Sequence, residues 1–498
     1  MAPEQPDVQH VDVLVVGAGL SGIGAACHLQ DECPGKSYLI LESRGAIGGT
    51  WDLFRYPGIR SDSDMFTLGY AFRPWKDSKA IADGAAIRSY IQETAREHGV
   101  EAKIRFHHQV LSADWSSADA RWTVTARRTD TGATVRFTCS WLTVCSGYYR
   151  YDEGFRPEFP GEERFPGQVI HPQHWPEDFD ATGKRIVVIG SGATAVTLVP
   201  NLAGAAEHVT MLQRTPSYVM TLPGRDPLAR FLRDKLPEKL AYPIVRWKNV
   251  LLSTAFYQFS QRFPKAARKL LHRLTQKQLP GVDVGTHFNP PYDPWDQRLC
   301  LVPDGDLFRS LRRGDASIVT GRIRTFTEKG IELESGEHLD ADVIVTATGL
   351  NLLPIGGMTL CRDGRPVDLS ETVSYKGMMI SGVPNFSMVI GYTNASWTLK
   401  ADLVNRYVCR LLNHMDAEGY VAATPVAPPE GADQPFLDLA SGYVQRSLTQ
   451  LPKQGRRKPW RLHQNYIRDV QLMRRGSLED EGMTFSRGVP TTTEKAVA

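Results

Sequence analysis

The chain contains two glycine-rich segments of the kind that join a buried strand to a helix in dinucleotide-binding domains. The first, DVLVVGAGLSG, ends a hydrophobic run with Gly17, Gly19 and Gly22, and a helix-forming segment follows it. A second hydrophobic run, SYLILE, then ends at Glu42. Glycines let the backbone approach a pyrophosphate at a helix N-terminus, and an acidic side chain at the end of the second strand accepts ribose hydroxyls. This segment therefore predicts a Rossmann-like site for FAD or NAD.

The second segment, KRIVVIGSGATAVTLVP, repeats the pattern with Gly190, Gly192 and Ala195. Its second strand, HVTMLQR, ends at Arg214, where the first unit has an acid. A guanidinium pairs with a 2′-phosphate that a carboxylate would repel, so this site is suited to NADP. Thr215 follows and could add a hydroxyl. The alternative for Arg214 is a solvated charge at a strand end.

The order of these units predicts an α/β fold of two nested Rossmann-like dinucleotide-binding domains with a helical insert. The strand-like segments WLTVCSGYY and DVIVTATGLN each end a unit, and 498 residues suffice for two or three domains. We expect an FAD domain over 1–150, an NADP domain over 151–350, and a return to the first domain with a C-terminal tail over 351–498. The segment YTNASWTLKADLVNRYVCRLLNHMD predicts the returning helix, which in two-dinucleotide flavoproteins covers the flavin.

Composition excludes several other classes of protein. A net charge of +3 is too small to indicate nucleic-acid binding. The seven cysteines are scattered and form no C-x-x-C, which indicates free thiols and neither a disulfide framework nor a metal site. The first residues lack the pattern of a signal peptide, so we expect a cytoplasmic protein.

The predicted insert, about 225–280, is strongly basic. It has thirteen Lys and Arg against three Asp and Glu, in segments with amphipathic helical patterning. This pattern is typical of a helix that contacts a membrane surface or forms a substrate lid. The alternative, which we favour at this point, is a helical subdomain with a solvated basic face.

Two further motifs carry a resemblance to a known family. The stretch FPGQVIHPQHWP has Phe165, Gly167, His171, Trp175 and Pro176 at the fixed positions of a signature of Baeyer–Villiger monooxygenases. The stretch GGTWDLFRYPGIRSD is similar to a second signature of that family, at Gly48, Gly49, Trp51, Tyr56, Pro57, Gly58 and Asp62. The resemblance covers nearly the whole chain and is strongest to family members that oxidise thioamides.

This resemblance implies an NADPH- and O₂-dependent flavin monooxygenase that forms a C4a-peroxyflavin. Such an enzyme converts ketones to esters or lactones and can oxidise sulfides or thioamides. The alternative is an S- or N-oxygenating flavin monooxygenase with no physiological ketone substrate, although such enzymes usually lack the final Trp-Pro. A disulfide reductase is excluded because no redox-active cysteine pair with the required spacing is present.

The family also implies roles for four residues. Arg298 would lie beside the reacting flavin, oriented by an ion pair with Asp62. His171 and Trp175 would couple the two cofactor domains rather than transfer oxygen. The alternatives are a salt bridge from Arg298 to Asp296 or a surface charge, an N-cap role for Asp62, and plain packing for His171 and Trp175.

The remaining contacts follow the same resemblance. FAD would contact Ser21, Gly22, Glu42, Thr50, Trp51, Asp52, Asp62 and Val110, the last through its backbone at the adenine. NADP would contact Gly190, Ser191, Gly192, Ala193, Thr194, Arg214 and Thr215, with Arg60 along its path. The expected partners are therefore FAD, NADPH, O₂ and a small ketone, sulfide or thioamide, with peripheral membrane contact through the insert left open.

Overall fold

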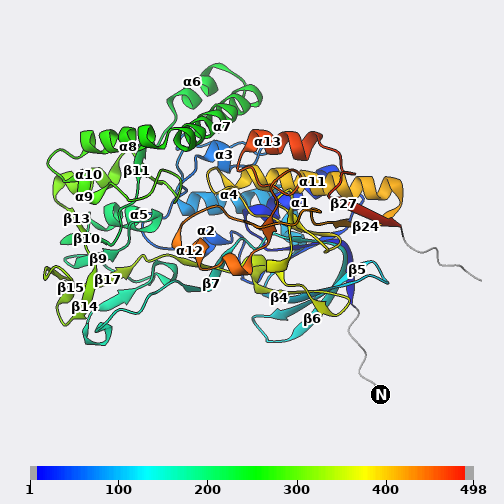
Figure 1. The fold of residues 1–498 in the computed structure, drawn as a ribbon, viewed down its shortest axis with the longest axis horizontal. Helices are drawn as coiled ribbons and strands as arrows, with labels where there is room; N and C mark the ends of the chain where they lie inside the picture. Colours follow the sequence, from blue (N-terminus) through cyan, green and yellow to red (C-terminus); the bar gives the residue numbers. More distant parts are fainter. Residues whose placement is uncertain (1–7, 488–498) are drawn as a thin grey trace, which may run out of the picture.

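The computed structural model describes residues 8–487, so the outermost parts of the first and last predicted ranges, 1–7 and 488–498, lie outside the described residues. Figure 1 shows two α/β lobes side by side, with a group of helices projecting above them. The chain forms one lobe, crosses to build the second, and returns to complete the first.

The first lobe is built on a nine-stranded sheet. Its order is β20-β19-β4-β5-β6-β1-β2-β3, with β23 also paired to β6. The pairings of β1 with β2 and β6 are parallel, whereas β4, β5 and β6 form an antiparallel meander. The strands are β1 (Gln9–Val16), β2 (Tyr38–Leu41), β3 (Ile104–Arg105), β4 (His108–Ser116), β5 (Arg121–Arg128), β6 (Thr134–Val144), β19 (Thr359–Arg362), β20 (Arg365–Pro366) and β23 (Phe386–Met388).

Helices cover one face of this sheet. The predicted returning helix is confirmed as α11, which packs against α1 above the sheet (Figure 1). The apolar side chains of α1 and α11 belong to one continuous core, and a second core lies on the other face of the sheet. The helices of this lobe are α1 (Leu20–Glu32), α2 (Thr50–Leu53), α3 (Met65–Leu68), α4 (Gly84–Glu97), α11 (Trp397–Glu418), α12 (Gly442–Gln445) and α13 (Tyr466–Val470).

The second lobe has a five-stranded parallel sheet in the order β13-β10-β9-β17-β8. Helices α5 and α10 pack together against it, and the meander β14–β16 buries its apolar side chains on the opposite face. Its elements are β8 (Gln168–Ile170), β9 (Arg185–Ile189), α5 (Ala193–Leu202), β10 (His208–Gln213), α9 (Val284–His287), α10 (Asp306–Arg313), β13 (Ala316–Thr320), β14 (Ile323–Thr327), β15 (Gly330–Leu333), β16 (His338–Asp340) and β17 (Val343–Thr346).

The lobes are joined by two antiparallel linker strands, β7 (Tyr149–Gly154) and β18 (Leu350–Leu352). The basic insert forms three helices, α6 (Pro227–Lys235), α7 (Glu238–Arg262) and α8 (Pro264–Gln278), between the paired strands β11 (Val219–Leu222) and β12 (Cys300–Pro303). Within residues 8–487, no helix has the length and apolar character needed to cross a bilayer. The remaining short strands are β21 (Ser374–Tyr375), β22 (Met379–Ile380), β24 (Tyr420–Pro425), β25 (Gln434–Pro435), β26 (Lys453–Gln454) and β27 (Met483–Arg487).

The α1–α11 contact contains a buried charged cluster. His28 on α1 lies 2.8 Å from Asp402 on α11 through Nε2, and 3.2 Å from Glu32 through Nδ1. The Arg474 guanidinium donates to the other Asp402 oxygen at 2.9 Å. Burial disfavours the imidazolium, but the hydrogen bonds to Asp402 and Glu32 prevail and raise the pKa of His28 to about 8.

We predict that this cluster makes stability depend on pH. Because the folded-state pKa of His28 is raised, its contribution is fully present below its unfolded value of 6.5 and is lost as pH rises through about 8. A shift of this size corresponds to roughly 2 kcal/mol. The thermal unfolding midpoint of the native protein should therefore fall more between pH 6 and 9 than that of His28→Gln. Parallel midpoint curves for the two proteins would show that the imidazolium contributes nothing.

Candidate active site

In the first glycine turn, Gly22 is tightly packed and Gly19 is less crowded. A Cβ on Gly22 would lie 1.9 Å from the carbonyl oxygen of Gly17. The residue Gly17 has a φ of +104°, a backbone conformation that favours glycine. A Cβ on Gly19, the residue before α1, would meet only the backbone of Gly49, at 3.6 Å. Gly22 thus provides close helix–strand packing, and Gly19 leaves the helix N-terminus accessible to a pyrophosphate.

Glu42 lies directly after β2 and is buried. One carboxylate oxygen accepts the Ala18 N–H at 2.7 Å and the other accepts the Arg44 N–H at 2.9 Å. Burial raises the pKa of Glu42, and these backbone donors partly offset that shift. The carboxylate keeps acceptor capacity beyond these two bonds, as contact with ribose hydroxyls requires.

The other residues expected at the first site lie around this turn in different ways. Val110 is buried in β4, a strand that contacts β2. The Thr50 hydroxyl is 3.1 Å from the Tyr151 hydroxyl, and Trp51 is half-buried beside it at the start of α2. Asp52 is buried and forms ion pairs with Arg44, Arg55 and Arg88, so its carboxylate organises the loop.

The Ser21 hydroxyl is engaged by a residue that the sequence analysis did not single out. The indole Nε1 of Trp397, at the start of α11, donates to Ser21 Oγ at 2.8 Å. The same indole stacks on Tyr148, with ring centroids 5.2 Å apart. Trp397 lies in the segment from which the sequence analysis predicted the returning helix.

The second glycine turn also combines one tightly packed glycine with one that has free space around it. A Cβ on Gly190 would lie 2.4 Å from the Ala347 carbonyl oxygen, whereas a Cβ on Gly192 would meet no protein atom within 4 Å. The Ser191 hydroxyl donates to the Thr215 carbonyl at 2.8 Å, which fixes the end of β10 beside the turn. Ala193 and Thr194 then begin α5. The backbone around this helix N-terminus fits a bound pyrophosphate.

Arg214 and Arg60, both expected near the second dinucleotide, differ in their surroundings. Arg214 follows β10, is exposed, and has no ion pair within the described part of the chain. Arg60 is instead paired with Asp306 at the start of α10. Arg214 is therefore the cation available to a phosphate, whereas the charge of Arg60 is already compensated.

Arg298 and Asp62 meet where the two lobes converge. Arg298 Nε lies 3.7 Å from Asp62 Oδ2, while no ion pair to Asp296 is found among the described residues. The N-cap of the following helix, α3, is Asp64, so Asp62 is free of that role. Cys300, two residues after Arg298, points its thiol at the Ser191 carbonyl of the second glycine turn, 3.7 Å away. This pair therefore connects the first lobe to the dinucleotide turn of the second.

Three tyrosines surround this pair, and the sequence analysis missed them. Burial would lower the pKa of Arg298, but Asp62 and then Tyr148, Tyr149 and Tyr443 more than offset it, so its pKa lies above the ordinary value. Burial raises the pKa of Tyr149 to about 12, and Tyr148 and Tyr443 shift in the same direction. The site thus combines a permanent cation with neutral phenols that can donate hydrogen bonds.

His171 and Trp175 lie at the junction but away from Arg298. His171 Nε2 is 3.2 Å from the Gly349 carbonyl, and Nδ1 accepts the Gln173 N–H at 3.2 Å. Its ring packs on Gly154 of β7, and burial lowers its pKa. Trp175 packs edge-on against Phe179 and the core of the second lobe. Among the described contacts, neither side chain bonds to Arg298 or Asp62, so both can act only by positioning.

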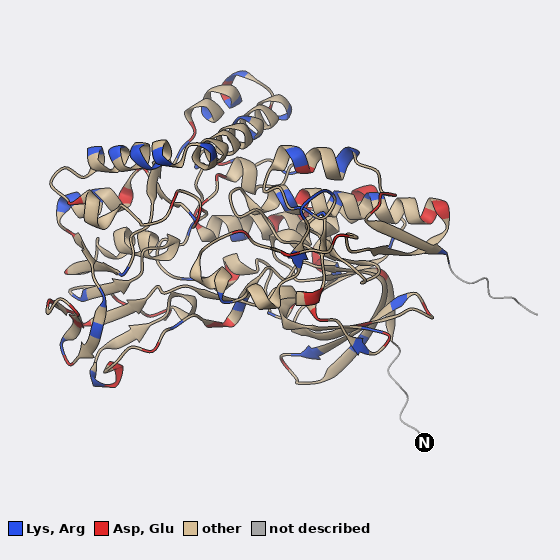
Figure 2. Ribbon diagram, viewed as in Figure 1, with Lys and Arg blue, Asp and Glu red and all other residues tan. Residues whose placement is uncertain are grey.

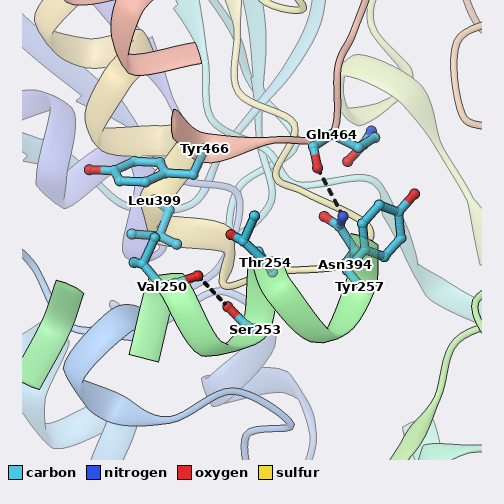
Figure 3. Close-up of a pocket in the computed structure, with 9 residues that line it drawn as sticks. Val250, Ser253, Thr254, Tyr257, Asn394, Leu399, Gln464 and Tyr466 are labelled. Carbon is cyan, nitrogen blue, oxygen red and sulfur yellow. Dashed lines mark hydrogen bonds between the residues drawn. The ribbon is translucent and has the colours of Figure 1, made fainter. Parts of the chain in front are cut away.

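A pocket lies beside this region, between α7 and the segments before α11 and α13. Figure 3 shows that Val250, Ser253, Thr254 and Tyr257 of α7 face Asn394 and Gln464, which are hydrogen-bonded to each other. Tyr257 packs edge-on against Trp295, three residues before Arg298. This ring contact links the lining of the pocket to the segment that precedes Arg298.

Two dinucleotide turns and an interlobe cation define a two-dinucleotide oxidoreductase, and comparison with known families specifies it further. A family described as flavin-binding monooxygenase-like matches residues 70–353, and an NAD(P)-binding Rossmann-like domain matches residues 15–82. The chain belongs to the flavin-binding monooxygenase-like family. The predicted fold class, with two Rossmann-like dinucleotide-binding domains, is confirmed.

Individual relatives agree with this assignment. The chain is 58% identical to the FAD-containing monooxygenase EthA of Mycobacterium tuberculosis over 482 residues, or 96% of this chain and 98% of that protein. It is 56% identical to EthA of Mycolicibacterium smegmatis with the same coverage. A steroid monooxygenase structure with bound NADP matches 96% of this chain and all of that chain, with a TM-score of 0.76 at 24% identity. A polycyclic ketone monooxygenase from Thermothelomyces thermophila matches 98% of this chain and 91% of that chain, with a TM-score of 0.74 at 18% identity. These structures establish a shared fold.

The two kinds of glycine predict opposite consequences of the same substitution. Gly192→Ala places a methyl group in space free of protein atoms, at a φ of −82°, so the unfolding midpoint should stay close to that of the native protein. Its affinity for NADP⁺, measured by calorimetry, should fall because the methyl group blocks close approach of the pyrophosphate. Gly22→Ala should instead lower stability by at least about 1–3 kcal/mol through overpacking. Normal NADP⁺ affinity in a folded Gly192→Ala protein would contradict this view of the second turn.

Proposed function

We propose that this flavin monooxygenase is an FAD-containing, NADPH-dependent Baeyer–Villiger monooxygenase. It converts ketones to esters or lactones and oxidises sulfides or thioamides at the same site. The observation that carries the proposal is the Arg298–Asp62 pair between the two dinucleotide turns, together with the two sequence signatures. The alternative is S- or N-oxygenation without a physiological ketone substrate.

The residues of the two turns fit the proposed cofactors. Gly19 and Glu42 would hold the pyrophosphate and ribose of FAD, and Gly192 and Arg214 would hold the pyrophosphate and 2′-phosphate of NADPH. When bound, FAD would provide the chemistry of accepting a hydride from NADPH and of activating O₂. The protein supplies the binding, orientation and charge.

Arg298 provides the charge. Oxygen transfer to a carbonyl places negative charge on oxygen atoms, and a fixed cation stabilises that charge most where water is excluded. Asp62 orients the guanidinium, while the raised pKa of Arg298 keeps it cationic at any working pH. Its side chain retains 35% exposure, so it can still contact a ligand.

His171 and Trp175 set the angle between the lobes. The His171 ring joins the end of β17 to the linker strand β7, so it holds the second dinucleotide turn at a fixed position relative to the first. We therefore assign these two residues to the delivery of the nicotinamide and not to oxygen transfer.

The choice of nicotinamide cofactor is tested by Arg214→Ala. Loss of one charge-assisted phosphate contact costs on the order of 1.5–3 kcal/mol, which corresponds to a tenfold to hundredfold rise in the KM for NADPH. NADH lacks the 2′-phosphate and is the internal control, so its KM should hardly change. An unaltered preference for NADPH in steady-state kinetics would show that Arg214 does not read the phosphate.

The oxygen-transfer role is tested by Arg298→Ala. This variant should retain its flavin, because Arg298 belongs to neither glycine turn, while ester and sulfoxide formed per NADPH fall at least a hundredfold, or roughly 3 kcal/mol. The electrons should appear as hydrogen peroxide. Product analysis by mass spectrometry on paired ketones and thioethers distinguishes the two substrate classes.

Two further variants sharpen this test. Arg298→Lys should recover only part of the product yield, because an ammonium is a point charge and lacks the planar fork that Asp62 orients. Arg324→Ala, which removes an exposed arginine of β14, is the matched control and should behave like the native enzyme. A near-native product yield from Arg298→Ala would refute the proposed mechanism.

A further inference from the structure

The insert helices α6–α8 expose an unusual number of large apolar side chains. Of the fourteen large hydrophobic residues that are exposed in the described part of the chain, ten lie on these helices and one more, Phe263, joins α7 to α8. They are Leu228, Phe231, Leu240, Ile244, Trp247, Leu251, Leu252, Phe259, Phe263, Leu270 and Leu274. A soluble surface ordinarily has such residues singly, so their concentration on one projecting element indicates a contact surface.

The apolar residues of α7 follow the helical period. Leu240, Ile244, Trp247 and Leu251 are spaced four, three and four residues apart, which places them along one stripe of the helix. A different set of α7 side chains, which includes Val250 and Tyr257, lines the pocket of Figure 3. The helix is therefore apolar towards the protein and also along this exposed stripe, in which Trp247 additionally contacts Tyr466 of α13.

Basic side chains accompany this stripe. Figure 2 shows Lys and Arg along α6–α8 with few acidic residues among them. The insert from Arg225 to Pro280 carries a net charge of +10. Among the described residues, its only cations in ion pairs are Lys248, with Asp226, and Arg268, with Asp293. The others on its surface, such as Lys265 and Lys269, have no anionic partner within residues 8–487.

We propose that α6–α8 dock this protein on the surface of an anionic lipid bilayer. The apolar stripe would enter the headgroup region, and the unpaired cations would meet lipid phosphates. Charge decides between the candidate occupants: a second copy of the chain would bring two surfaces of the same sign together, whereas an anionic bilayer neutralises them. The helices lie on the surface, since none of the described helices can span a bilayer.

The docking surface lies next to the pocket of Figure 3, whose lining residue Tyr257 contacts Trp295 in the segment before Arg298. Because α7 carries both the stripe and four residues of that pocket, docking would bring the pocket beside the bilayer. This favours apolar substrates dissolved in lipid, a consequence that rests on the proposed function. The docking itself does not depend on it.

The test uses the full-length protein with its bound flavin and vesicles of phosphatidylcholine, with and without phosphatidylglycerol. In co-sedimentation, we expect binding to the anionic vesicles that weakens as salt screens the charges, and little binding to neutral ones. Lys265→Glu/Lys269→Glu should reduce the partition coefficient at least about 25-fold, because each lost basic charge is worth about fivefold. Ile244→Glu/Leu251→Glu should also abolish binding, because it places charges in the apolar stripe.

Matched controls separate docking from general effects of charge. The charge control is Arg121→Glu/Lys329→Glu, and the apolar control is Leu111→Glu/Val421→Glu; all four residues are exposed and lie outside the insert. Both controls should bind anionic vesicles far better than the corresponding insert variants. Flavin content and unfolding midpoint verify that every variant is folded. The proposal is overturned if the native protein fails to bind, if it binds neutral vesicles equally, or if insert and control variants behave alike. If the native protein self-associates without lipid and Ile244→Glu/Leu251→Glu abolishes this association, the docking surface binds a second copy of the chain instead of a bilayer.

Discussion

The architecture depends on the close backbone approach at the two glycine turns. In the first turn, α1 begins close to the end of β1, and the contact of Gly22 with the Gly17 carbonyl leaves no room for a side chain. The first glycine of each turn is packed closely as well: a Cβ on Gly17 would lie 2.7 Å from the Cys145 carbonyl oxygen, and one on Gly190 would lie 2.4 Å from the Ala347 carbonyl oxygen. The middle glycine of each turn is less crowded: a Cβ on Gly19 would make only an ordinary contact with Gly49, and a Cβ on Gly192 would meet no protein atom within 4 Å. The close backbone contacts that shape each turn therefore also create a surface for a dinucleotide.

The region between the two turns is built from segments that are far apart in the chain. Asp62 belongs to the first lobe, Arg298 follows the insert, and Tyr443 comes from the C-terminal part. The Arg298 guanidinium thus interacts electrostatically with groups from distant parts of the sequence. Such a convergence requires the lobes to keep a fixed orientation, and the hydrogen bond between His171 and the Gly349 carbonyl contributes to that orientation. In this arrangement the chemistry of the site and the geometry of the linkers cannot be separated.

Sequence reasoning was most successful where chemistry depends on local spacing. The strand–turn–helix units and the long helix α11 follow from glycine spacing and hydrophobic periodicity. It was less successful where the contacts of a side chain are made with a segment that is distant in the sequence. The contact of Trp397 with Ser21, the pairing of Arg60 with Asp306, and the tyrosines around Arg298 join residues that no local pattern relates. Similarly, charge counting identified the insert as basic, but only the folded helices show which of its apolar residues remain uncovered.

The nested topology has a consequence for the order in which the protein can be completed during synthesis. The parallel sheet of the second lobe is entirely encoded between β8 and β17, so all of its strands are available once residue 346 has left the ribosome. The first lobe, although it begins earlier, has to wait for β23 to pair with β6 and for α11 to cover α1. Until then, the end of β6 at Leu142–Val144 is unpaired on one side and the apolar face of α1 is exposed, and such surfaces promote aggregation. The domain that starts first is thus finished last, and this interval is when a nascent chain would most need a chaperone.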